Sequence, residues 1–490
     1  MLLSSLVILP LLTVLAVAFC KELQQIRVVA FIGTLLQLAL VAYIYTAYQS
    51  QSITQSNFLL ERDCEWFPLL NIHYHVGVDG ISMAMIILTA IIVIAGVLVS
   101  WKIKELSKEF FILLLLLSAG AYGFFISLDV FTLFFFLEVA VIPKFLLITI
   151  WGSGKKEYSA MKLALMLMTG SALIFVGLMG LYYTAHSFDL QTISKTLLNP
   201  EAQKIIFPFL FIGFGFFAAL FPFHTWVPDG HSSAPTAASM FLAGISMKLG
   251  GYGCLRVATY LLPYAAQYYS PYIIALAAIA ILYGAFATMM QTDLKYINAY
   301  SSVSHCGFVL LGIGMLTQTA ITGAVMQMVS HGLMTALFFA AIGMLYERTH
   351  TRQVKELGGL LKVMPFISTV FIIAGLCSLG LPGLSGFAAE VTVFVGSWQR
   401  TETAYRIATI VSCASIVVTA VYILRATGSS ILGAVKNEHF LSLKDATWNE
   451  KLAALLLLIG IIVIGIMPYV LQNAITAPVV DIMNHLNANK

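Results

Sequence analysis

The chain of 490 residues is 60% hydrophobic and only 10% charged, with a formal net charge of +4 at neutral pH. This composition is typical of a polytopic membrane protein and excludes a water-soluble domain as its main body. So small a net charge on so long a chain does not indicate nucleic-acid binding. The six cysteines stand singly. The sequence therefore predicts neither an iron–sulfur cluster, nor a zinc site, nor a disulfide framework.

Fourteen apolar stretches are long enough to cross a hydrocarbon layer ~30 Å thick. The first lacks a basic leader and a small-residue cleavage site, so we expect it to be kept as a spanning helix. The longest polar stretches, 48–76 and 426–450, are only loop-sized. The expected spans lie near 1–20, 27–46, 79–101, 110–127, 129–151, 157–185, 203–223, 236–263, 270–291, 296–316, 320–346, 364–399, 403–425 and 451–471.

Lysine and arginine are concentrated on alternate connections between these spans, as expected of cytoplasmic loops. The richest connections are 102–108, 348–362 and 436–451. The intervening connections carry few basic residues. With an even number of spans, we expect both termini on the non-cytoplasmic side of a multi-pass protein in an energy-coupling membrane.

Proline and glycine interrupt two of the expected spans, at 221–229 (FPFHTWVPD) and 381–386 (LPGLSG). Broken helices at corresponding positions of two halves are typical of inverted-repeat transporters, whose ion site lies near the breaks. We therefore expect an all-α polytopic membrane fold of about 14 transmembrane helices, with two inverted five-helix repeats that each contain one broken helix. The alternative is that membrane helices simply tolerate proline and glycine.

This arrangement divides the chain into four parts. Residues 1–109 form helices 1–3, and residues 110–263 form the first repeat, helices 4–8. Residues 264–425 form the second repeat, helices 9–13. Residues 426–490 form a loop and the C-terminal helix 14.

Isolated ionisable side chains within the apolar stretches are the strongest indication of function. A charge in hydrocarbon costs several kcal/mol, so it is kept mainly where it is buried among helices and used. Counting 1.5 Å of rise per residue places several of these groups near the midplane, which suits a lateral proton relay bridged by water. The candidates are Glu138, Lys144, Lys248, His305, His331 and Glu390.

Five of the six candidates also have a structural interpretation. Glu138 and Lys248 could only form ion pairs. His305 and His331 could be neutral groups that fix helix packing, and Glu390 could cap local backbone.

Four other polar residues lie near the expected helix ends. His224 and His231 flank the first break and either join the relay or satisfy the free backbone groups there. Asp229 is typical of turn chemistry after a proline. Lys295 is expected to be a solvated loop charge.

Several motifs, in order along the chain from Trp66 to Val395, resemble one family. They are LE at 137–138 with IP at 142–143, HTWVPDGHSSAPT at 224–236, KLGGYG at 248–253, QTDLK at 291–295, AYSSVSH at 299–305, and LPG at 381–383 followed by Glu390. The chain resembles the antiporter-like membrane subunits of respiratory complex I.

The resemblance implies a proton-translocating membrane-arm subunit of an NADH or related donor:quinone oxidoreductase, driven by quinone reduction in other subunits. The chain is expected to hold no cofactor, metal or redox centre of its own. NAD(H), FMN, iron–sulfur clusters and quinone are expected in partner subunits. The implied partners are other membrane-arm subunits, including sister antiporter-like subunits, and the lipid bilayer of a bacterial cytoplasmic membrane.

One position departs from the family pattern. Relatives carry a lysine seven residues before the first histidine of the 224–236 motif, where this chain has Phe217. That lysine pairs with the glutamate that corresponds to Glu138. Lys144 lies about 9 Å along the helix axis from Glu138 and about 120° around it, too far for direct contact. We expect Lys144 to reach the same polar cavity and to take over part of the electrostatic role.

Two other functions remain open. A cation/proton antiporter or membrane-bound hydrogenase subunit would share the fold, although Glu390 and the stretch from Thr225 to Gly253 argue against it. A structural subunit that no longer conducts is motivated only by Phe217. The retention of the other ionisable groups argues against that alternative.

Overall fold

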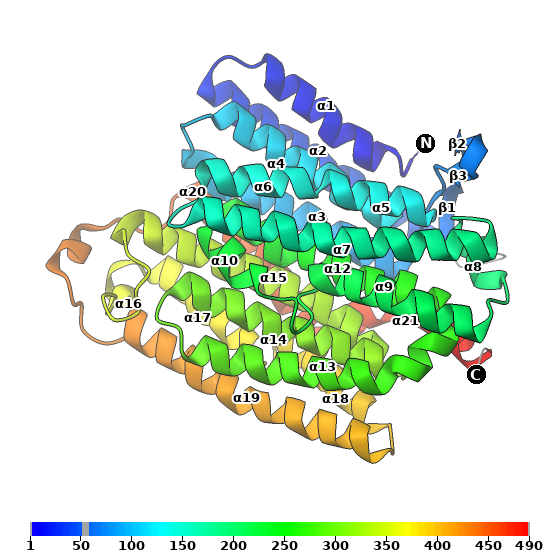
Figure 1. The fold of residues 1–490 in the computed structure, drawn as a ribbon. Helices are drawn as coiled ribbons and strands as arrows, with labels where there is room; N and C mark the ends of the chain where they lie inside the picture. Colours follow the sequence, from blue (N-terminus) through cyan, green and yellow to red (C-terminus); the bar gives the residue numbers. More distant parts are fainter. Residues whose placement is uncertain (1, 51–57, 489–490) are drawn as a thin grey trace.

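The computed structural model describes residues 2–50 and 58–488. It is mainly helical, with long helices packed side by side (Figure 1). The helices are α1 (Ser5–Phe19), α2 (Leu23–Ser50), α3 (Gly80–Val99), α4 (Ser107–Ile126), α5 (Val130–Val139), α6 (Val141–Trp151), α7 (Lys156–Ala185), α8 (Leu190–Lys195), α9 (Pro200–Phe217), α10 (Trp226–Ser233), α11 (Thr236–Phe241), α12 (Met247–Gly253), α13 (Pro263–Met289), α14 (Leu294–Gly314), α15 (Gln318–Thr349), α16 (Leu360–Val363), α17 (Pro365–Ser378), α18 (Ser385–Trp398), α19 (Thr403–Ser430), α20 (Trp448–Ile466) and α21 (Tyr469–Ala488).

Within residues 2–50 and 58–488, nine helical stretches are long and apolar enough to cross a membrane. They include α5 and α6 taken together, and the 32-residue α15. Three helices that adjoin the two expected breaks, α10, α17 and α18, have only 8, 14 and 14 residues and fall outside this set. The chain therefore has a mostly helical polytopic membrane fold, and the expected number of about 14 spans stays a prediction.

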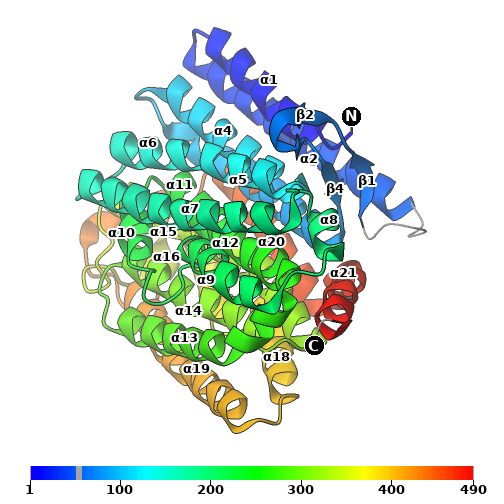
Figure 2. The same ribbon diagram turned by 45° about the vertical axis from the view of Figure 1, so that its right-hand side comes forward.

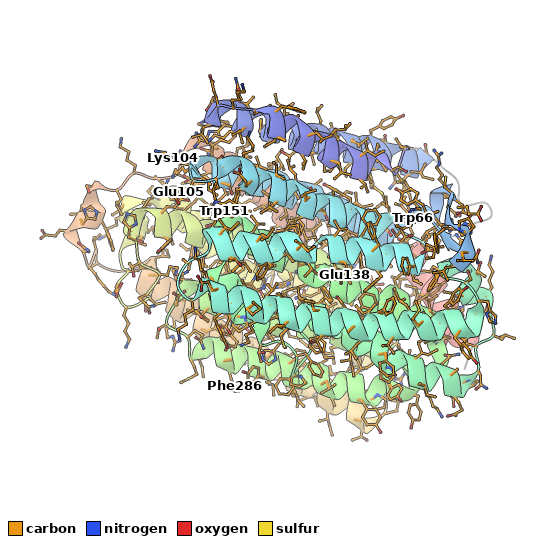
Figure 3. All side chains as sticks on the ribbon, turned by 45° about the horizontal axis from the view of Figure 1, so that its top comes forward. Trp66, Lys104, Glu105, Glu138, Trp151 and Phe286 are labelled. Carbon is orange, nitrogen blue, oxygen red and sulfur yellow. The ribbon has the colours of Figure 1, made fainter. Side chains whose placement is uncertain are left out.

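Both ends of the described chain lie at one end of the helical bundle. Helix α1 begins there and α21 ends there, beside the short strands (Figures 1 and 2). Lys104, Glu105 and Trp151 lie at the opposite end (Figure 3). The connection that carries Lys104 is one of the basic ones, so it is separated from the chain ends by the length of the bundle.

The polar stretch before α3 contains four short strands where the sequence indicated only a loop. Strand β1 (Leu59–Arg62) pairs antiparallel with β4 (Val76–Val78), and β2 (Glu65–Phe67) pairs with β3 (Ile72–His73). These pairs lie at the same end of the bundle as both chain ends (Figure 2). Residues 51–57 of the same stretch lie outside the described residues.

Both predicted helix interruptions are present. Helix α9 ends at Phe217 and α10 begins at Trp226, so the motif around His224 spans the first break. Helix α17 ends at Ser378 and α18 begins at Ser385. Proline causes both interruptions because it has no N–H to donate to the preceding turn. The breaks expose backbone groups inside the bundle, where only protein or water can satisfy them.

The span expected at 129–151 is divided in two directly after Glu138. Helix α5 ends at Val139 and α6 begins at Val141. Pro143 has no N–H for the carbonyl of Val139, four residues earlier, so the helical hydrogen-bond ladder is interrupted there. Glu138 therefore stands at the end of a short helix and not in the middle of a continuous one.

The C-terminal part differs from the expectation of one final helix. Helix α20 ends at Ile466, and a second helix, α21, covers residues 469–488. Met467 precedes Pro468 and has a non-helical backbone, as residues before proline usually do. The polar residues of α21, among them Gln472 and Asp481, interrupted the apolar run on which the sequence prediction depended.

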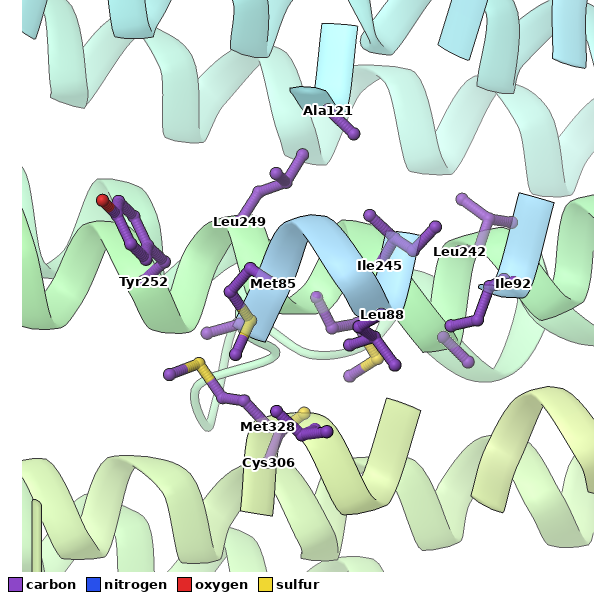
Figure 4. Close-up of a cluster of buried hydrophobic side chains, with 14 of the residues drawn as sticks. Met85, Leu88, Ile92, Ala121, Leu242, Ile245, Leu249, Tyr252, Cys306 and Met328 are labelled. Atoms are coloured by element: carbon purple, nitrogen blue, oxygen red, sulfur yellow. The ribbon is translucent and has the colours of Figure 1, made fainter. Parts of the chain in front are cut away.

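The core is apolar where the isolated charges stand. Side chains from α3, α4, α12, α14 and α15 meet in one buried cluster (Figure 4). A π-helical stretch, η3 (Leu242–Ser246), contributes Leu242 and Ile245. Leu249 and Tyr252 come from α12, the helix that carries Lys248. Lys248 must therefore find its polar contacts among few groups.

Candidate functional site

Lys248 lies in a seven-residue α-helix between two π-helical stretches. Helix α12 is preceded by η3 and followed by η4 (Cys254–Thr259). Such wide turns are rare and are frequent at functional sites. The Lys248 side chain is 1% exposed. Its Nζ donates to the Ala243 carbonyl and lies 2.7 Å from Nδ1 of His331 on α15.

Gly250 allows the helix of Lys248 to pack tightly against the end of α9. A Cβ atom added at Gly250 would lie 2.3 Å from the backbone nitrogen of Ala218. A larger residue would push α12 away from α9. The absence of a side chain at Gly250 therefore fixes the position of Lys248 relative to the first break.

His305 connects His331 to Glu390. The rings of His305 on α14 and His331 are 5.3 Å apart between centroids. Nδ1 of His305 lies 3.3 Å from Oε1 of Glu390 on α18. Nε2 of His305 lies 3.0 Å from the hydroxyl of Ser378, and Nδ1 also lies 3.3 Å from the amide of Gln327. His305 thus contacts polar groups through both ring nitrogens.

The second break makes room for Glu390. Gly380 has a φ of +76°, a conformation that favours glycine. A Cβ atom there would lie 2.8 Å from Oε2 of Glu390. The Glu390 side chain is 5% exposed, and its contact with His305 shows that it does more than cap local backbone.

Four predicted residues, Lys248, His331, His305 and Glu390, therefore form one buried chain. The sequence analysis expected water to bridge most of these groups, because neighbouring helix axes lie 8–10 Å apart. That expectation was wrong for two of the three steps, which are direct contacts. Only the step between the two imidazoles has no direct polar contact among the described residues.

Glu138 lies outside this chain. Its half-buried carboxylate accepts a hydrogen bond from the Ser171 hydroxyl on α7. Figure 3 places Glu138 midway between the end of the bundle marked by Trp66 and the end marked by Trp151. It makes no hydrogen bond to Lys144 or Lys248 in the part of the chain that the structure describes. The expectation that Lys144 does not contact Glu138 directly is confirmed.

Lys144 is buried on α6 and lies over an aromatic ring. Its side chain is 1% exposed. Its Nζ has no hydrogen-bond partner in residues 2–50 and 58–488. The distance from this Nζ to the ring centroid of Phe217 is 5.7 Å. The position that departs from the family pattern is therefore next to the proposed substitute cation.

The two histidines of the first break are both buried. The ring of His231 lies 5.6 Å from that of Phe339 and 5.8 Å from that of Trp226. Neither ring nitrogen of His231 has a partner among the described side chains and backbone, so this residue does not satisfy the backbone of the break. The ring of His224 lies 4.8 Å from that of Tyr283, and its Nδ1 has no partner in the same part of the chain.

Two residues were misread from the sequence. Lys295 is 4% exposed, and its Nζ donates to the Ala234 carbonyl at 2.7 Å, so it is not a solvated loop charge. Asp229 is bound by Lys162 at 2.7 Å and lies inside α10, so it is not a turn residue. No sequence signal distinguished Lys295, because its partner lies 61 positions away.

A pocket of about 450 Å³ opens beside Lys295. It lies near the end of the bundle that carries Lys104 and Trp151 in Figure 3. Its polar and aromatic lining includes Lys102, Trp151, Thr236, Lys295, Tyr346 and Glu347. Nowhere in residues 2–50 and 58–488 are three or more His, Cys, Asp or Glu side chains grouped to hold a metal ion.

Residues 127–417 match the family described as NADH:quinone oxidoreductase/Mrp antiporter, TM. The chain belongs to this family. NADH-quinone oxidoreductase subunit M of Rickettsia bellii is 36% identical over 411 residues, which cover 83% of this chain and 82% of that protein. NAD(P)H-quinone oxidoreductase chain 4 2 of Microcystis aeruginosa is 38% identical over 384 residues, which cover 77% and 69%. The resemblance seen in the sequence is confirmed.

Two solved structures share the fold of this chain. A chain of respiratory complex I from Thermus thermophilus superposes with a TM-score of 0.90 at 24% identity, over 99% of this chain and 100% of that one. A chain of the Mrp complex from Dietzia sp. superposes with a TM-score of 0.87 at 18% identity, over 100% and 99%. Since both kinds of complex match, the fold alone does not distinguish them.

Proposed function

We propose that this chain is subunit M, also called chain 4, of a complex I-type NADH or related donor:quinone oxidoreductase, and that it translocates protons. The observation that carries the proposal is the buried chain from Lys248 to Glu390 within this family's fold. A hydrocarbon-embedded row of lysine, histidine and glutamate has a cost in stability that a purely structural role does not explain. The subunit is driven by quinone reduction in other chains.

The contacts support a direction of roles along the relay. Lys248 carries an ammonium on a flexible stem, which can release a proton when it is desolvated. His331 receives that proton at Nδ1, which faces Lys248. An imidazole can accept at one nitrogen and release from the other. His305 then passes the proton to Glu390, which lies beside the second break.

The pocket beside Lys295 is the proposed entrance. It opens at the end of the bundle that carries Lys104, the end expected to face the cytoplasm. His231 is assigned to the path between this pocket and the relay, because it is buried three residues before Ala234, which lines the pocket and accepts a hydrogen bond from Lys295. Its unpartnered ring nitrogens suit a group that exchanges protons with water. His224 is assigned to the same break as a further polar group.

The proposal extends to architecture and partners. The two breaks support inverted five-helix repeats at 110–263 and 264–425, flanked by 1–109 and 426–490. Both ends of the chain are assigned to the non-cytoplasmic side of a bacterial cytoplasmic membrane. The partners are sister antiporter-like subunits and other membrane-arm subunits. NAD(H), FMN, iron–sulfur clusters and quinone are assigned to partner subunits, and this chain supplies no redox centre.

The direct test is Lys248→Ala in the intact complex reconstituted into vesicles. We expect the number of protons moved per electron pair to fall while electron transfer from the donor to quinone continues. The matched control is Lys204→Ala, which removes a partly exposed lysine paired with exposed Glu201. Unchanged proton pumping in Lys248→Ala would contradict the assigned relay.

A cation/proton antiporter subunit is the second candidate, because the Mrp complex from Dietzia sp. has the same fold. The two functions differ in their energy source. Proton uptake that follows a sodium gradient, with no electron donor present, would favour the antiporter. Proton uptake that requires donor and quinone would favour the oxidoreductase.

A further inference from the structure

Lys144 is the buried charge that the relay from Lys248 to Glu390 leaves unused. Of the lysines within residues 2–50 and 58–488, it alone combines a buried side chain with an Nζ that has no hydrogen-bond partner. The ring of Phe217, also 1% exposed, lies 5.7 Å from this Nζ. The end of α9 therefore forms part of the wall around the Lys144 ammonium.

An unpaired ammonium in a low-dielectric interior is unfavourable, so it must lose its proton or be balanced by a negative charge. The face of an aromatic ring attracts a cation, but this attraction is smaller than the free-energy cost of removing the ammonium from water. Phe217 alone is therefore insufficient. A carboxylate is available on the same stretch of chain, because Glu138 lies six residues before Lys144.

Glu138 likewise has no close partner of opposite charge among the described residues. Its described hydrogen bond comes from the neutral hydroxyl of Ser171, and no cation of the described chain forms a close ion pair with it. The helix break between Val139 and Val141 separates it from Lys144 on the same stretch of chain. A carboxylate and an ammonium in this arrangement are stable together in two net-neutral forms. Either both are charged, or both are neutral.

We propose that Glu138 and Lys144 share one proton and act as a unit. In one form Glu138 is the carboxylic acid and Lys144 the amine. In the other, the proton has moved through intervening water to give the Glu138 carboxylate and the Lys144 ammonium, so no charge is created or lost. The inference rests on the proposed function, because a shared proton has a use only if this chain translocates protons.

Phe217 sets where the Lys144 ammonium stands. Its ring faces Lys144, while its backbone lies against Gly250, two residues after Lys248. A lysine at position 217, in place of the phenylalanine, would extend from α9 toward the space that the Lys144 side chain occupies. The same pocket can therefore be supplied with an ammonium from either α6 or α9.

The test compares three variants in the intact complex reconstituted into vesicles. Lys144→Met removes the amine and is expected to lower the rate of proton pumping roughly tenfold or more, as for loss of a positioned proton-transfer group. Lys144→Arg keeps the positive charge but cannot release a proton, so it is expected to be about as slow. The double variant K144M/F217K restores an ammonium from the opposite wall and is expected to recover pumping at least in part.

Each outcome decides the inference. Normal pumping by Lys144→Arg overturns the shared proton, and normal pumping by Lys144→Met overturns any role for the pair. Lys248→Ala in parallel separates the two claims: if it abolishes pumping while Lys144→Met does not, this inference fails and the proposed function stands. If Lys144→Met does not assemble, Lys144→Arg and the double variant decide. An assembled double variant that pumps no better than Lys144→Arg also counts against the inference.

Discussion

The two polar regions of this protein are built in opposite ways. From Lys248 to Glu390, side chains of four helices make direct contacts, with a single gap between two imidazoles. Around Glu138 and Lys144 the charges stand apart, with a hydroxyl and an aromatic ring as their close neighbours. A contiguous chain fixes the path of a proton. A separated pair leaves its charge state open to change, which suits control more than conduction.

The largest effect should come from cutting the contiguous chain. His305→Leu removes the imidazole that lies between His331 and Glu390, so both residues lose their contact with it. We expect proton pumping to fall roughly tenfold or more, in line with the loss of a positioned acid–base group. Proton uptake and quinone reduction are measured on the same vesicles. Pumping at the parental rate would mean that the contacts are structural and that the contrast between the regions has no functional meaning.

The packing of α12 against the end of α9, which connects the two regions, should be sensitive to a larger side chain at Gly250. Gly250→Val places a side chain against the backbone of Ala218, next to Phe217. Overpacking of this kind costs about 1–3 kcal/mol, so the unfolding temperature of the purified complex should fall. Gly428→Val is the control, because a Cβ there meets no atom within 4 Å. Equal stability of the two variants would show that close packing of α12 against α9 does not contribute to stability.

A smaller effect is expected from removing the hydroxyl beside the separated pair. Ser171→Ala removes the hydroxyl that donates to Glu138. A hydrogen bond to a charged or partly charged group contributes about 0.5–3 kcal/mol, and Lys144 remains to balance the carboxylate. Pumping should therefore slow by less than in His305→Leu. If Ser171→Ala stops pumping altogether, the Glu138 region depends on fixed contacts as much as the other does.

The smallest effect lies outside the membrane-spanning segments, at the contact of His75 with Asp189. Burial opposes the charged form of His75, but its hydrogen bond to Asp189 and the nearby carboxylates outweigh this and raise its pKa above 6.5. Burial likewise opposes the Asp189 carboxylate, but the hydrogen bonds from His75 and Thr192 lower its pKa below 3.8.

The sign of the pH dependence follows from these two shifts. The His75 contribution to stability is complete below pH 6.5 and is lost as the pH rises through the raised pKa. The Asp189 contribution is complete above pH 3.8 and is lost as the pH falls through the lowered pKa. Because the pair is partly exposed, its net worth should stay below about 1 kcal/mol. The difference in unfolding temperature between parent and Asp189→Asn should shrink as the pH rises through the pKa of His75, and the part due to the hydrogen bonds from Thr192 should remain.

Local chemistry explains what could be predicted from the sequence. Pro222 and Pro382 act on their own turns, so the helix breaks were placed correctly. The candidate relay residues were recognisable because charge is rare in apolar segments. The contact of Lys248 with His331 joins residues 83 positions apart and depends on how α12 meets α15. No local pattern encodes such a contact, and the burial of Lys295 went unrecognised for the same reason.

The π-helical stretches around Lys248 affect the direction in which its side chain points around the helix axis. An ordinary helix turns by about 100° per residue, and a π turn accommodates one extra residue. The direction of Lys248 is therefore set by the wide turn at Leu242–Ser246 and not by the periodicity of the surrounding sequence. If that turn tightened to an α turn, Lys248 would rotate by about a quarter of a circle away from His331. The register of one short segment thus determines whether the lysine points along the proposed relay or across it.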